Sequence, residues 1–433
     1  MKIYRGRIYN PLDETSFEDI PDGALVVNQD GRITEHGPWE ECGRKYVESN
    51  KETKVKYFSN RILMPGLIDT HTHLPQFDCM GRSGFHLQDW LNNFVFPAEE
   101  KLEDPAVAQD TATRFFAALL RSGTTTAMIF SSNFEEATDI AFEEAARVGI
   151  RAIIGKTMMD RKSPPKLTNG TEQSIKESMR LCEKWHNTHG GRLLYAFSPR
   201  FAISCSFELM HLVGKVAKQT IRGCRPYIQT HLSENEDEVK EVHRLFPKIK
   251  SYTDVYKEAG LLRERTIVAH AIHLTNEEHQ ILSTTGTSVA HCPSSNFFLK
   301  SGNMDLHTMR RHNIKVGLGT DIGAGPDTCM FTVMKDAYYA SKDTSVAVSF
   351  LLYLATLGGA RALGLDDRIG NFQQEKEADF IVINPRNDQL EAIAPNSDID
   401  KLLSFLIFRA DDRVIEKVYV AGRDVYTKEI TQE

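Results

Sequence analysis

The sequence predicts an α/β fold, in which a (β/α)₈ barrel is joined to a small β-sandwich domain formed by both ends of the chain. The middle of the chain alternates eight short apolar runs with helical stretches, a pattern typical of a parallel sheet with covering helices. Both ends read as β-structure instead. The 433 residues also exceed the roughly 250 of a barrel, which leaves room for a second domain.

The small domain is predicted from hairpin signals near both termini. Asp30-Gly31 is a strong turn signal between two strand candidates, and Ala421-Gly422 has the same place near the other end. Chain termini often lie close together, so we expect residues 1–61 and 366–433 to form one β-sandwich and residues 62–365 to form the barrel. The strand candidates of this domain are Ala24–Val27, Arg32–Thr34, Ala378–Ile383, Lys417–Val420 and Asp424–Tyr426.

The barrel strands are predicted from the eight apolar runs. The runs are Gly66–His73, Thr124–Phe130, Arg151–Met159, Leu193–Phe201, Pro226–Glu234, Thr266–His273, Ser288–Asn296 and Lys315–Asp321. Helix signals separate many of them. Asp104-Pro105 is expected to begin a helix, and Asn133 with Glu136 and Thr275 with Glu278 fit the capping-box pattern.

Composition excludes several classes of protein. With 41% hydrophobic and 26% charged residues the chain reads as globular, and its net charge of −7 argues against a nucleic-acid partner. The seven cysteines are scattered and form no Cys-x-x-Cys pair, which fits a reducing compartment such as the cytoplasm. We see neither a signal peptide nor an apolar run near the roughly 18 residues of a membrane span, and expect no membrane partner.

Histidine or aspartate residues lie at or near the ends of five of the eight predicted strands. In a parallel barrel these carboxyl ends share one face, which is where active sites form. The segments are His71-Thr72-His73, His231-Leu232-Ser233-Glu234, Ala269-His270, His291 and Gly319-Thr320-Asp321.

A metal site is predicted from four of these residues. His71 and His73 stand at positions i and i+2 of one strand, so both imidazoles point the same way and can reach one ion. His231 and Asp321 would complete a set of nitrogen and oxygen ligands, which suits Zn²⁺, with Fe²⁺ as the next candidate. Any one of the fifteen histidines, taken alone, is expected to be an ordinary core or surface residue. Four ligand-type side chains at strand ends together favour the metal.

Two carboxylates are candidates for moving protons. A bound metal can lower the pKa of water from 15.7 to about 7, and Asp321 in its first coordination shell could take that proton. Glu234 lies three residues beyond His231 and is the candidate proton shuttle, because a closed pocket raises the pKa of a carboxyl group. The structural alternative is a helix cap, since 233–236 also fits a capping box.

Further residues and absences refine the prediction. His270 is expected to orient the activated water, and His291 to shape the pocket wall. Many binuclear hydrolases of this architecture bridge two metals with a modified lysine at the end of strand four, but 196–201 contains no lysine, so we expect a single metal. The chain also lacks the His-x-Glu and Pro-Cys-x-x-Cys signature of the other zinc deaminase fold and the Gly-x-Ser-x-Gly elbow.

The segment 64–73, Met-Pro-Gly-Leu-Ile-Asp-Thr-His-Thr-His, resembles the opening motif of the amidohydrolase superfamily. With His231, His270 and Asp321, the chain is similar to the branch that uses one metal to deaminate purines, pyrimidines and related rings. The resemblance covers nearly the whole chain and implies a homodimer.

Closer matches resemble the family members that deaminate guanine. They are Gln76 after the His-x-His pair, Asp89-Trp90-Leu91, Phe96-Pro97-Ala98-Glu99, Ser198-Pro199-Arg200-Phe201 and His231-Leu232-Ser233-Glu234-Asn235. The resemblance implies that Gln76 and Arg200 hold the purine and that Phe201 lines its ring. Arg200 is a fixed donor, and Gln76 offers a donor beside an acceptor. The other expected substrate contacts are Trp90, His231 and Glu234.

The activity implied is hydrolysis of the 2-amino group of guanine, giving xanthine and ammonia. One alternative is a deaminase or dechlorinase of another heterocycle, such as 8-oxoguanine, a pterin or a triazine. A second alternative is a catalytically inactive protein of this fold that serves in binding. Residues 323–325 read Gly-Ala-Gly and depart from the family pattern, which could adjust the ring that is preferred.

Overall fold

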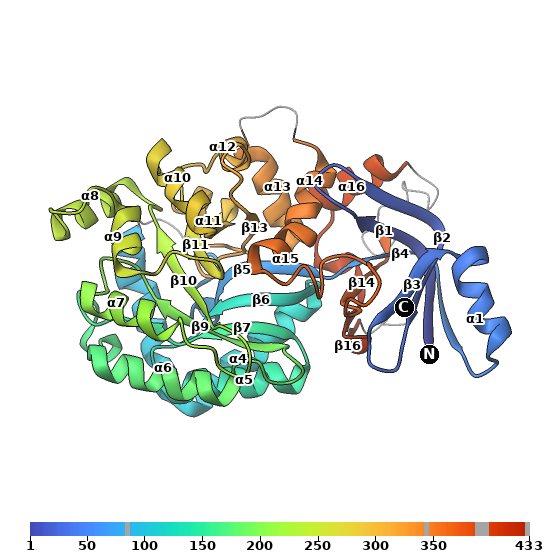
Figure 1. Cartoon of the computed structure of the whole chain (residues 1–433), viewed down its shortest axis with the longest axis horizontal. Helices are drawn as coiled ribbons and strands as arrows, with labels where there is room; N and C mark the ends of the chain where they lie inside the picture. Colours follow the sequence, from blue (N-terminus) through green and yellow to red (C-terminus); the bar gives the residue numbers. More distant parts are fainter. Residues whose placement is uncertain (83–86, 342–345, 386–397, 429–433) are drawn as a thin grey trace.

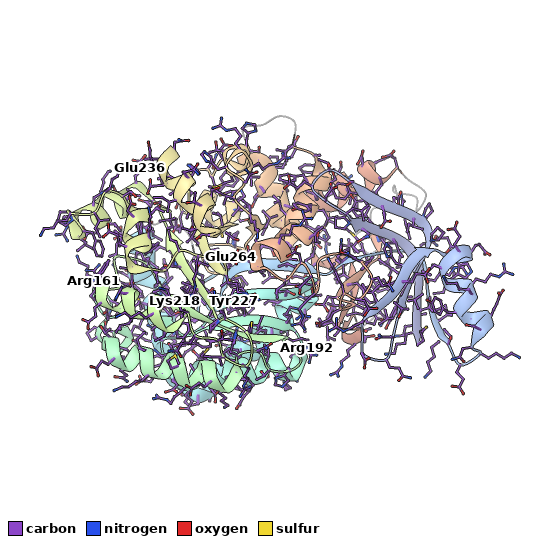
Figure 2. All side chains as sticks on the ribbon, viewed as in Figure 1. Arg161, Arg192, Lys218, Tyr227, Glu236 and Glu264 are labelled. Atoms are coloured by element: carbon purple, nitrogen blue, oxygen red, sulfur yellow. The ribbon has the colours of Figure 1, made fainter. Side chains whose placement is uncertain are left out.

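The computed structural model describes residues 1–82, 87–341, 346–385 and 398–428. A barrel and a smaller sheet lie side by side, and both chain ends are found at the small sheet (Figure 1). Side chains fill the space between the elements (Figure 2); of the residues labelled there, Tyr227 is fully buried, whereas Glu236 is exposed. None of the described helices is both long and apolar enough to cross a membrane.

Eight parallel strands form the barrel wall. Hydrogen bonds join neighbours in the order in which they follow along the chain, and the short strand β8 (Thr157–Met158) pairs with β9. The last strand returns to the first, because the amide of Asp321 donates to the carbonyl of His71 over 2.9 Å and Thr70 Oγ1 donates to the carbonyl of Leu318. The strands are β5 (Leu67–His73), β6 (Thr124–Phe130), β7 (Arg151–Gly155), β9 (Leu193–Pro199), β10 (Tyr227–Leu232), β11 (Thr266–His270), β12 (Ser288–His291) and β13 (Val316–Leu318).

Helices surround the barrel (Figure 1). Asp104 accepts a hydrogen bond from the Ala106 amide at the start of α4 (Pro105–Arg121), as the sequence predicts, and Phe115 and Leu119 of that helix are fully buried. Thr275 and Glu278 form the predicted capping box of α10 (Asn276–Thr285). The other helices are α5 (Glu135–Val148), α6 (Thr171–Trp185), α7 (Phe207–Val216), α8 (Glu236–Leu245), α9 (Tyr252–Ala259), α11 (Pro293–Phe298), α12 (Leu306–Arg311), α13 (Met330–Ala340), α14 (Val348–Leu354), α15 (Leu357–Leu363) and α16 (Ile399–Phe408). Short helices include α1 (Arg44–Ser49), α2 (Leu87–Trp90) and α3 (Phe96–Glu100).

Both chain ends build one mixed sheet of seven strands. Two contacts show that the sheet curls on itself. The Ile33 amide donates to the Lys376 carbonyl, and the ring centroids of Tyr4 on β1 and Phe380 on β14 lie 4.8 Å apart although β4 stands between these strands. A buried apolar cluster fills the curl, so a single sheet encloses the core that we expected between two layers. In spatial order the strands are β16 (Arg423–Thr427), β15 (Ile415–Val420), β14 (Phe380–Ile383), β4 (Lys54–Pro65), β1 (Lys2–Pro11), β2 (Phe17–Val27) and β3 (Ile33–Pro38).

The two predicted hairpins are confirmed. Strands β2 and β3 pair in antiparallel fashion around Gly31, and β15 and β16 pair around Ala421-Gly422. Gly31 has φ +79° and Gly422 has φ +67°, values that glycine adopts without steric cost. The domain boundaries at 61/62 and 365/366 stay predictions.

Several predicted strands are too long at their carboxyl ends. Arg151–Met159 divides into β7 and β8, Ser288–Asn296 ends at His291 before helix α11, and Lys315–Asp321 is a strand only over Val316–Leu318. The backbone turns away at these ends: His270, the last residue of β11, has φ +70°, and Asp321, three residues beyond β13, has φ +48°, both far from regular strand values. These irregular strand ends carry the polar side chains of His270 and Asp321.

The capping box predicted at Asn133 is wrong. The residue that caps α5 is Phe134, and the Asn133 amide group instead donates to the Leu167 carbonyl over 2.9 Å. The Asn133 side chain therefore binds a residue distant in sequence instead of the helix end that the local pattern predicted.

A buried ion-pair network joins the barrel to the small sheet. Arg151 at the start of β7 is fully buried, and its guanidinium contacts Glu377 at 2.6 Å and Asp379 at 3.3 Å beside β14. Arg368 contacts Glu377 as well. Breaking one member of a buried pair leaves an uncompensated charge, which costs far more than losing an exposed pair.

We therefore expect Arg151→Met to lower the free energy of unfolding by about 3–5 kcal/mol, the cost of stranding buried carboxylates. Urea unfolding followed by tryptophan fluorescence measures it. The matched control is Arg44→Met, which removes an arginine that pairs with Glu40 and Glu48 at the surface and should leave the midpoint almost unchanged. Equal shifts in the two variants would show that the junction does not depend on this network.

Candidate metal centre and active-site pocket

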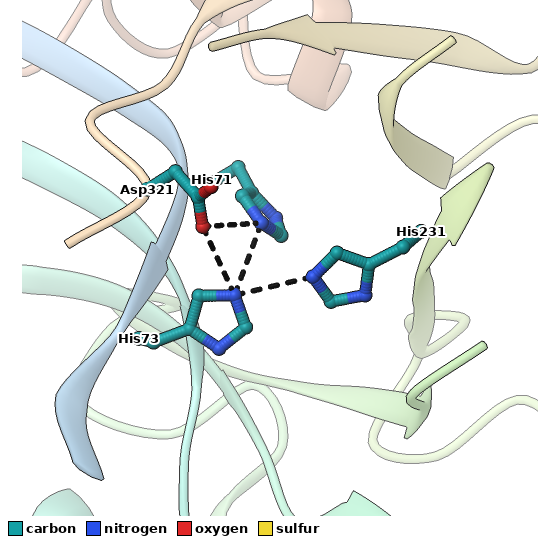
Figure 3. Close-up of side chains that lie close together, drawn as sticks. All are labelled: His71, His73, His231 and Asp321. Atoms are coloured by element: carbon teal, nitrogen blue, oxygen red, sulfur yellow. Dashed lines mark hydrogen bonds and ion pairs between the residues drawn. The ribbon is translucent and has the colours of Figure 1, made fainter. Parts of the chain in front are cut away.

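Four side chains from three parts of the barrel converge at one point (Figure 3). The Nε2 atom of His73 lies 3.2 Å from Nε2 of His71 and 3.2 Å from Nε2 of His231. One oxygen of Asp321 lies 3.2 Å from the Nε2 atoms of His71 and His73. All four are buried, and their ligand atoms lie within 4.8 Å of one another.

Local structure explains why these side chains meet. His71 and His73 are two residues apart on β5, so both side chains point to the same face, toward the barrel mouth. His231 projects from the end of β10. Asp321 follows β13 in the left-handed region of backbone conformation. Asp69 holds the two segments together: its carboxylate accepts hydrogen bonds from the backbone amides of His71 and Thr320. Burial raises the pKa of Asp69 to about 7, against the effect of these hydrogen bonds.

The donor set fits a divalent cation. His231 Nδ1 lies 2.7 Å from the Arg200 carbonyl, which can only accept, so Nδ1 carries the proton and the Nε2 lone pair faces the cluster. Such an outer contact is typical of metal-bound histidine. Three imidazole nitrogens and a carboxylate, brought together without a cation between them, would place lone pairs against one another. A cation that takes nitrogen and oxygen ligands removes that conflict.

Electrostatics favours the ligand forms of these groups. Burial lowers the pKa of His73 to about 3 and also lowers the pKa values of His71 and His231, so the imidazoles are neutral at pH 7. Burial opposes ionisation of Asp321, but contact with His71 and His73 outweighs it and holds the Asp321 pKa well below its usual range. Neutral imidazole and ionised carboxylate are the forms that bind metals.

Glu234 and His270 lie beside this cluster. His270 Nε2 is 3.6 Å from a Glu234 oxygen and 3.8 Å from an Asp321 oxygen. Burial raises the pKa of Glu234 to about 7, so a substantial fraction carries a proton at neutral pH. Burial opposes protonation of His270, but the carboxylates outweigh it and raise its pKa.

The backbone around Glu234 is held firmly. The predicted capping box over 233–236 is wrong by two residues: Asn235 and Glu238 form the box of α8, and Ser233 has φ +49°. A Glu238 carboxylate oxygen accepts a hydrogen bond of 2.8 Å from the backbone N–H of Glu234. The Glu234 side chain itself takes no part in the cap, and Ser301 donates to it over 3.2 Å.

A cavity opens directly beside the four-residue cluster, and its wall combines apolar side chains with a few polar groups, as is typical of small-molecule sites. Phe201 and Trp90 contribute apolar surface, because the Trp90 N–H is already donated to the Arg82 carbonyl. Gln76 and Arg200 contribute polar groups. The described lining residues are His73, Gln76, Leu87, Trp90, Leu91, Arg200, Phe201, His231, Glu234, His270, Leu299, Asp321 and Ala324.

The structure also reveals partners that sequence reasoning missed. Glu99, part of the motif Phe96-Pro97-Ala98-Glu99, forms a buried ion pair with Arg200 at 2.7 Å. Asn296 lies 2.9 Å from His270 Nδ1. His291, expected at the pocket wall, is buried outside the lining. No spacing rule in the sequence pointed from Glu99 to its partner 101 positions away.

Comparison with known proteins agrees with this geometry. The amidohydrolase family model matches residues 62–425. The chain is 39% identical to the guanine deaminase of Escherichia coli (strain K12), covering 94% of this chain and 92% of that protein. It is 34% identical to the guanine deaminase of Dictyostelium discoideum, covering 98% of each.

Solved structures give the same picture. E. coli guanine deaminase superposes with a TM-score of 0.92 at 36% identity, covering 99% of this chain and all of the other. Guanine deaminase from C. acetobutylicum with guanine bound in its active site gives 0.90 at 30% identity, covering 98% and 100%. An adenosine deaminase from Xanthomonas campestris with bound zinc gives 0.84 at 25% identity, covering 98% and 92%.

The cluster predicts a measurable metal affinity. After removal of metal with a chelator, we expect the protein to take up one divalent ion per chain, and His73→Gln to weaken binding at least about tenfold, because even outer-shell changes cost 10–100-fold. Elemental analysis after dialysis against limiting metal measures this. The control is His279→Gln on α10, whose Nδ1 contacts only the Thr275 carbonyl among its described hydrogen bonds. Equal metal content in the two variants would rule out His73 as a ligand.

Proposed function

This chain belongs to the amidohydrolase family, and we propose that it hydrolyses guanine to xanthine and ammonia. The observation that carries the proposal is the pocket, in which a cluster of three histidines and an aspartate stands next to Gln76, Arg200 and a protonatable Glu234. Relatives that share nearly the full length of the chain are guanine deaminases, and one solved neighbour holds guanine in its active site.

His71, His73, His231 and Asp321 are proposed to hold the metal. When bound, such an ion supplies a hydroxide-like nucleophile near neutral pH by lowering the pKa of water to about 7. Asp321 is ionised, and its carboxylate is proposed to accept the proton of that water. His270, with Nε2 directed at Glu234 and Asp321, is placed to orient the water oxygen toward C2 of the purine.

Glu234 is proposed to move the protons that chemistry at C2 requires. Its pKa of about 7 makes it an acid at neutral pH, and it donates its proton to the ring nitrogen next to C2 as the water oxygen adds. Addition interrupts the aromatic ring and makes C2 tetrahedral. One proton of the water passes by way of Asp321 and Glu234 to the amino group, and the C–N bond breaks to release ammonia. The second proton leaves the C2 hydroxyl as the C2=O bond of xanthine forms, and it returns to Glu234, which is then protonated as at the start.

The pocket walls are proposed to position the ring. Phe201 and Trp90 offer flat apolar surface for a base, and stacking of this kind contributes roughly 1–3 kcal/mol per base. Gln76 and Arg200 are proposed to hold the polar edge, with His231 and Glu234 close to C2. Fixing the base in this way brings C2 and the water oxygen into reacting geometry without a further loss of freedom.

Finer assignments complete the proposal. We propose one Zn²⁺ per subunit, with Fe²⁺ as the alternative, because the donor set suits both and a structural neighbour holds zinc. We also propose a homodimer and a cytoplasmic location. All seven cysteines are free in the structure, which supports a reducing compartment.

The test is to mix metal-loaded protein with guanine and to follow xanthine by absorbance and ammonia by a coupled assay. We expect turnover of guanine, and we expect Glu234→Gln to lower kcat by about 10²–10⁴-fold, the usual contribution of a general acid. Metal content should stay unchanged. The matched control is Glu236→Gln, an exposed residue two positions away, which should retain normal turnover.

Two results would count against the proposal. Near-normal turnover by Glu234→Gln with metal bound would remove Glu234 from its assigned role. No product from guanine, but ammonia or chloride from 8-oxoguanine, a pterin or a triazine, would retain the reaction type and reject guanine as the substrate.

A further inference from the structure

We propose that Glu99 determines which ring the pocket accepts, by turning a carbonyl oxygen of Gln76 and the N–H groups of Arg200 toward the ligand. The pocket then selects a ring edge with an N–H beside a C=O, as in a 6-oxopurine, over the reversed edge of a 6-aminopurine. This inference rests on the proposed function and concerns substrate selection within that same site.

Glu99 contacts Gln76 and Arg200, the two cavity-lining side chains that we propose to hold the ring. It lies on α3 and is 3% exposed. Its two oxygens accept hydrogen bonds from Arg200 Nη1 at 2.9 and 2.7 Å, and one of them accepts from Gln76 Nε2 at 3.4 Å. Gln76 and Arg200 are themselves almost fully buried, so neither can easily turn to water for an alternative partner.

The chemistry of a carboxylate fixes the orientation of the Gln76 amide. An ionised carboxylate only accepts hydrogen bonds, whereas an amide has a donating NH₂ and an accepting oxygen. Gln76 therefore presents its NH₂ to Glu99, and its oxygen is the group left for a ligand. Gly323 makes room for that oxygen, because a Cβ atom at this position would lie 2.4 Å from it. The Gly-Ala-Gly segment that departs from the family pattern thus has a steric role beside Gln76.

Arg200 is fixed by the same residue. Both contacts with Glu99 use Nη1, which leaves other N–H groups of the fork for a ligand. The Phe96 ring, also from α3, lies 5.3 Å from the guanidinium carbon and limits its movement. An arginine has no acceptor at any orientation. The recognition edge therefore combines an acceptor from Gln76 with donors from Arg200.

Guanine matches this edge and 2,6-diaminopurine does not. Guanine offers N1–H as a donor and O6 as an acceptor, whereas 2,6-diaminopurine offers N1 as an acceptor and a 6-amino group as a donor. Both rings carry the same amino group at C2, so the reacting centre is unchanged. A buried site built for one hydrogen-bond pattern rejects a mismatched analogue strongly, because its own polar groups would be left unpaired.

The experiment compares kcat/KM for guanine and for 2,6-diaminopurine in the metal-loaded protein. We expect the wild type to prefer guanine by at least about 10³-fold, within the range seen for sites that read hydrogen bonds. Glu99→Gln should reduce this ratio at least tenfold, because a neutral amide at position 99 can donate as well as accept and lets Gln76 turn. Glu99→Asp keeps an acceptor-only group and should preserve the preference even where the rate falls.

The control is Glu100→Gln, a change of the same type at the next residue of the helix, for which we expect the wild-type ratio. Equal losses for both substrates in Glu99→Gln, with the ratio unchanged, would assign Glu99 a structural role and overturn the inference. A wild type that deaminates 2,6-diaminopurine as well as guanine would overturn it without any variant. A wild type that releases no ammonia from guanine would instead reject the proposed function.

Discussion

The structure depends on one electrostatic constraint, the meeting of three imidazole nitrogens and a carboxylate oxygen about 3.2 Å apart in a buried place. Burial keeps the imidazoles neutral, and their lone pairs then face one another. A cation that takes nitrogen and oxygen ligands makes this arrangement favourable. The irregular strand ends and the Asp69 bridge hold Asp321 in the cluster despite its unfavourable φ.

Arg200 connects the four-residue cluster to the neighbouring cavity. Its backbone carbonyl fixes the tautomer of His231, and its side chain faces the cavity and pairs with Glu99. The residue directly after β9 therefore fixes the direction of the His231 Nε2 lone pair and also contributes a charged group to the pocket wall. Displacing its backbone would disturb both, so substitutions here should not be read as effects on binding alone.

Much of the fold could be predicted because the periodicity of apolar residues and the residues that start helices or form turns are strong local signals. The barrel strands, the hairpins at Gly31 and Gly422 and the helix start at Asp104 depend on residues close in sequence. The predictions at Asn133 and Ser233 failed because small polar residues fit several local motifs, and tertiary partners decide between them. The strand ends were overextended for a related reason, since alternation alone does not reveal a left-handed residue.

The candidate cluster was predictable because His71 and His73 share a strand face and Asp321 lies shortly after another strand. The contact of Glu99 with Arg200, by contrast, joins distant segments. The central claim is that four side chains share one cation. Anomalous diffraction from crystals of the zinc-loaded protein tests it most directly. We predict one peak at 2.0–2.2 Å from the three Nε2 atoms and an Asp321 oxygen. A peak elsewhere, or none within the cluster at saturating zinc, would contradict the account.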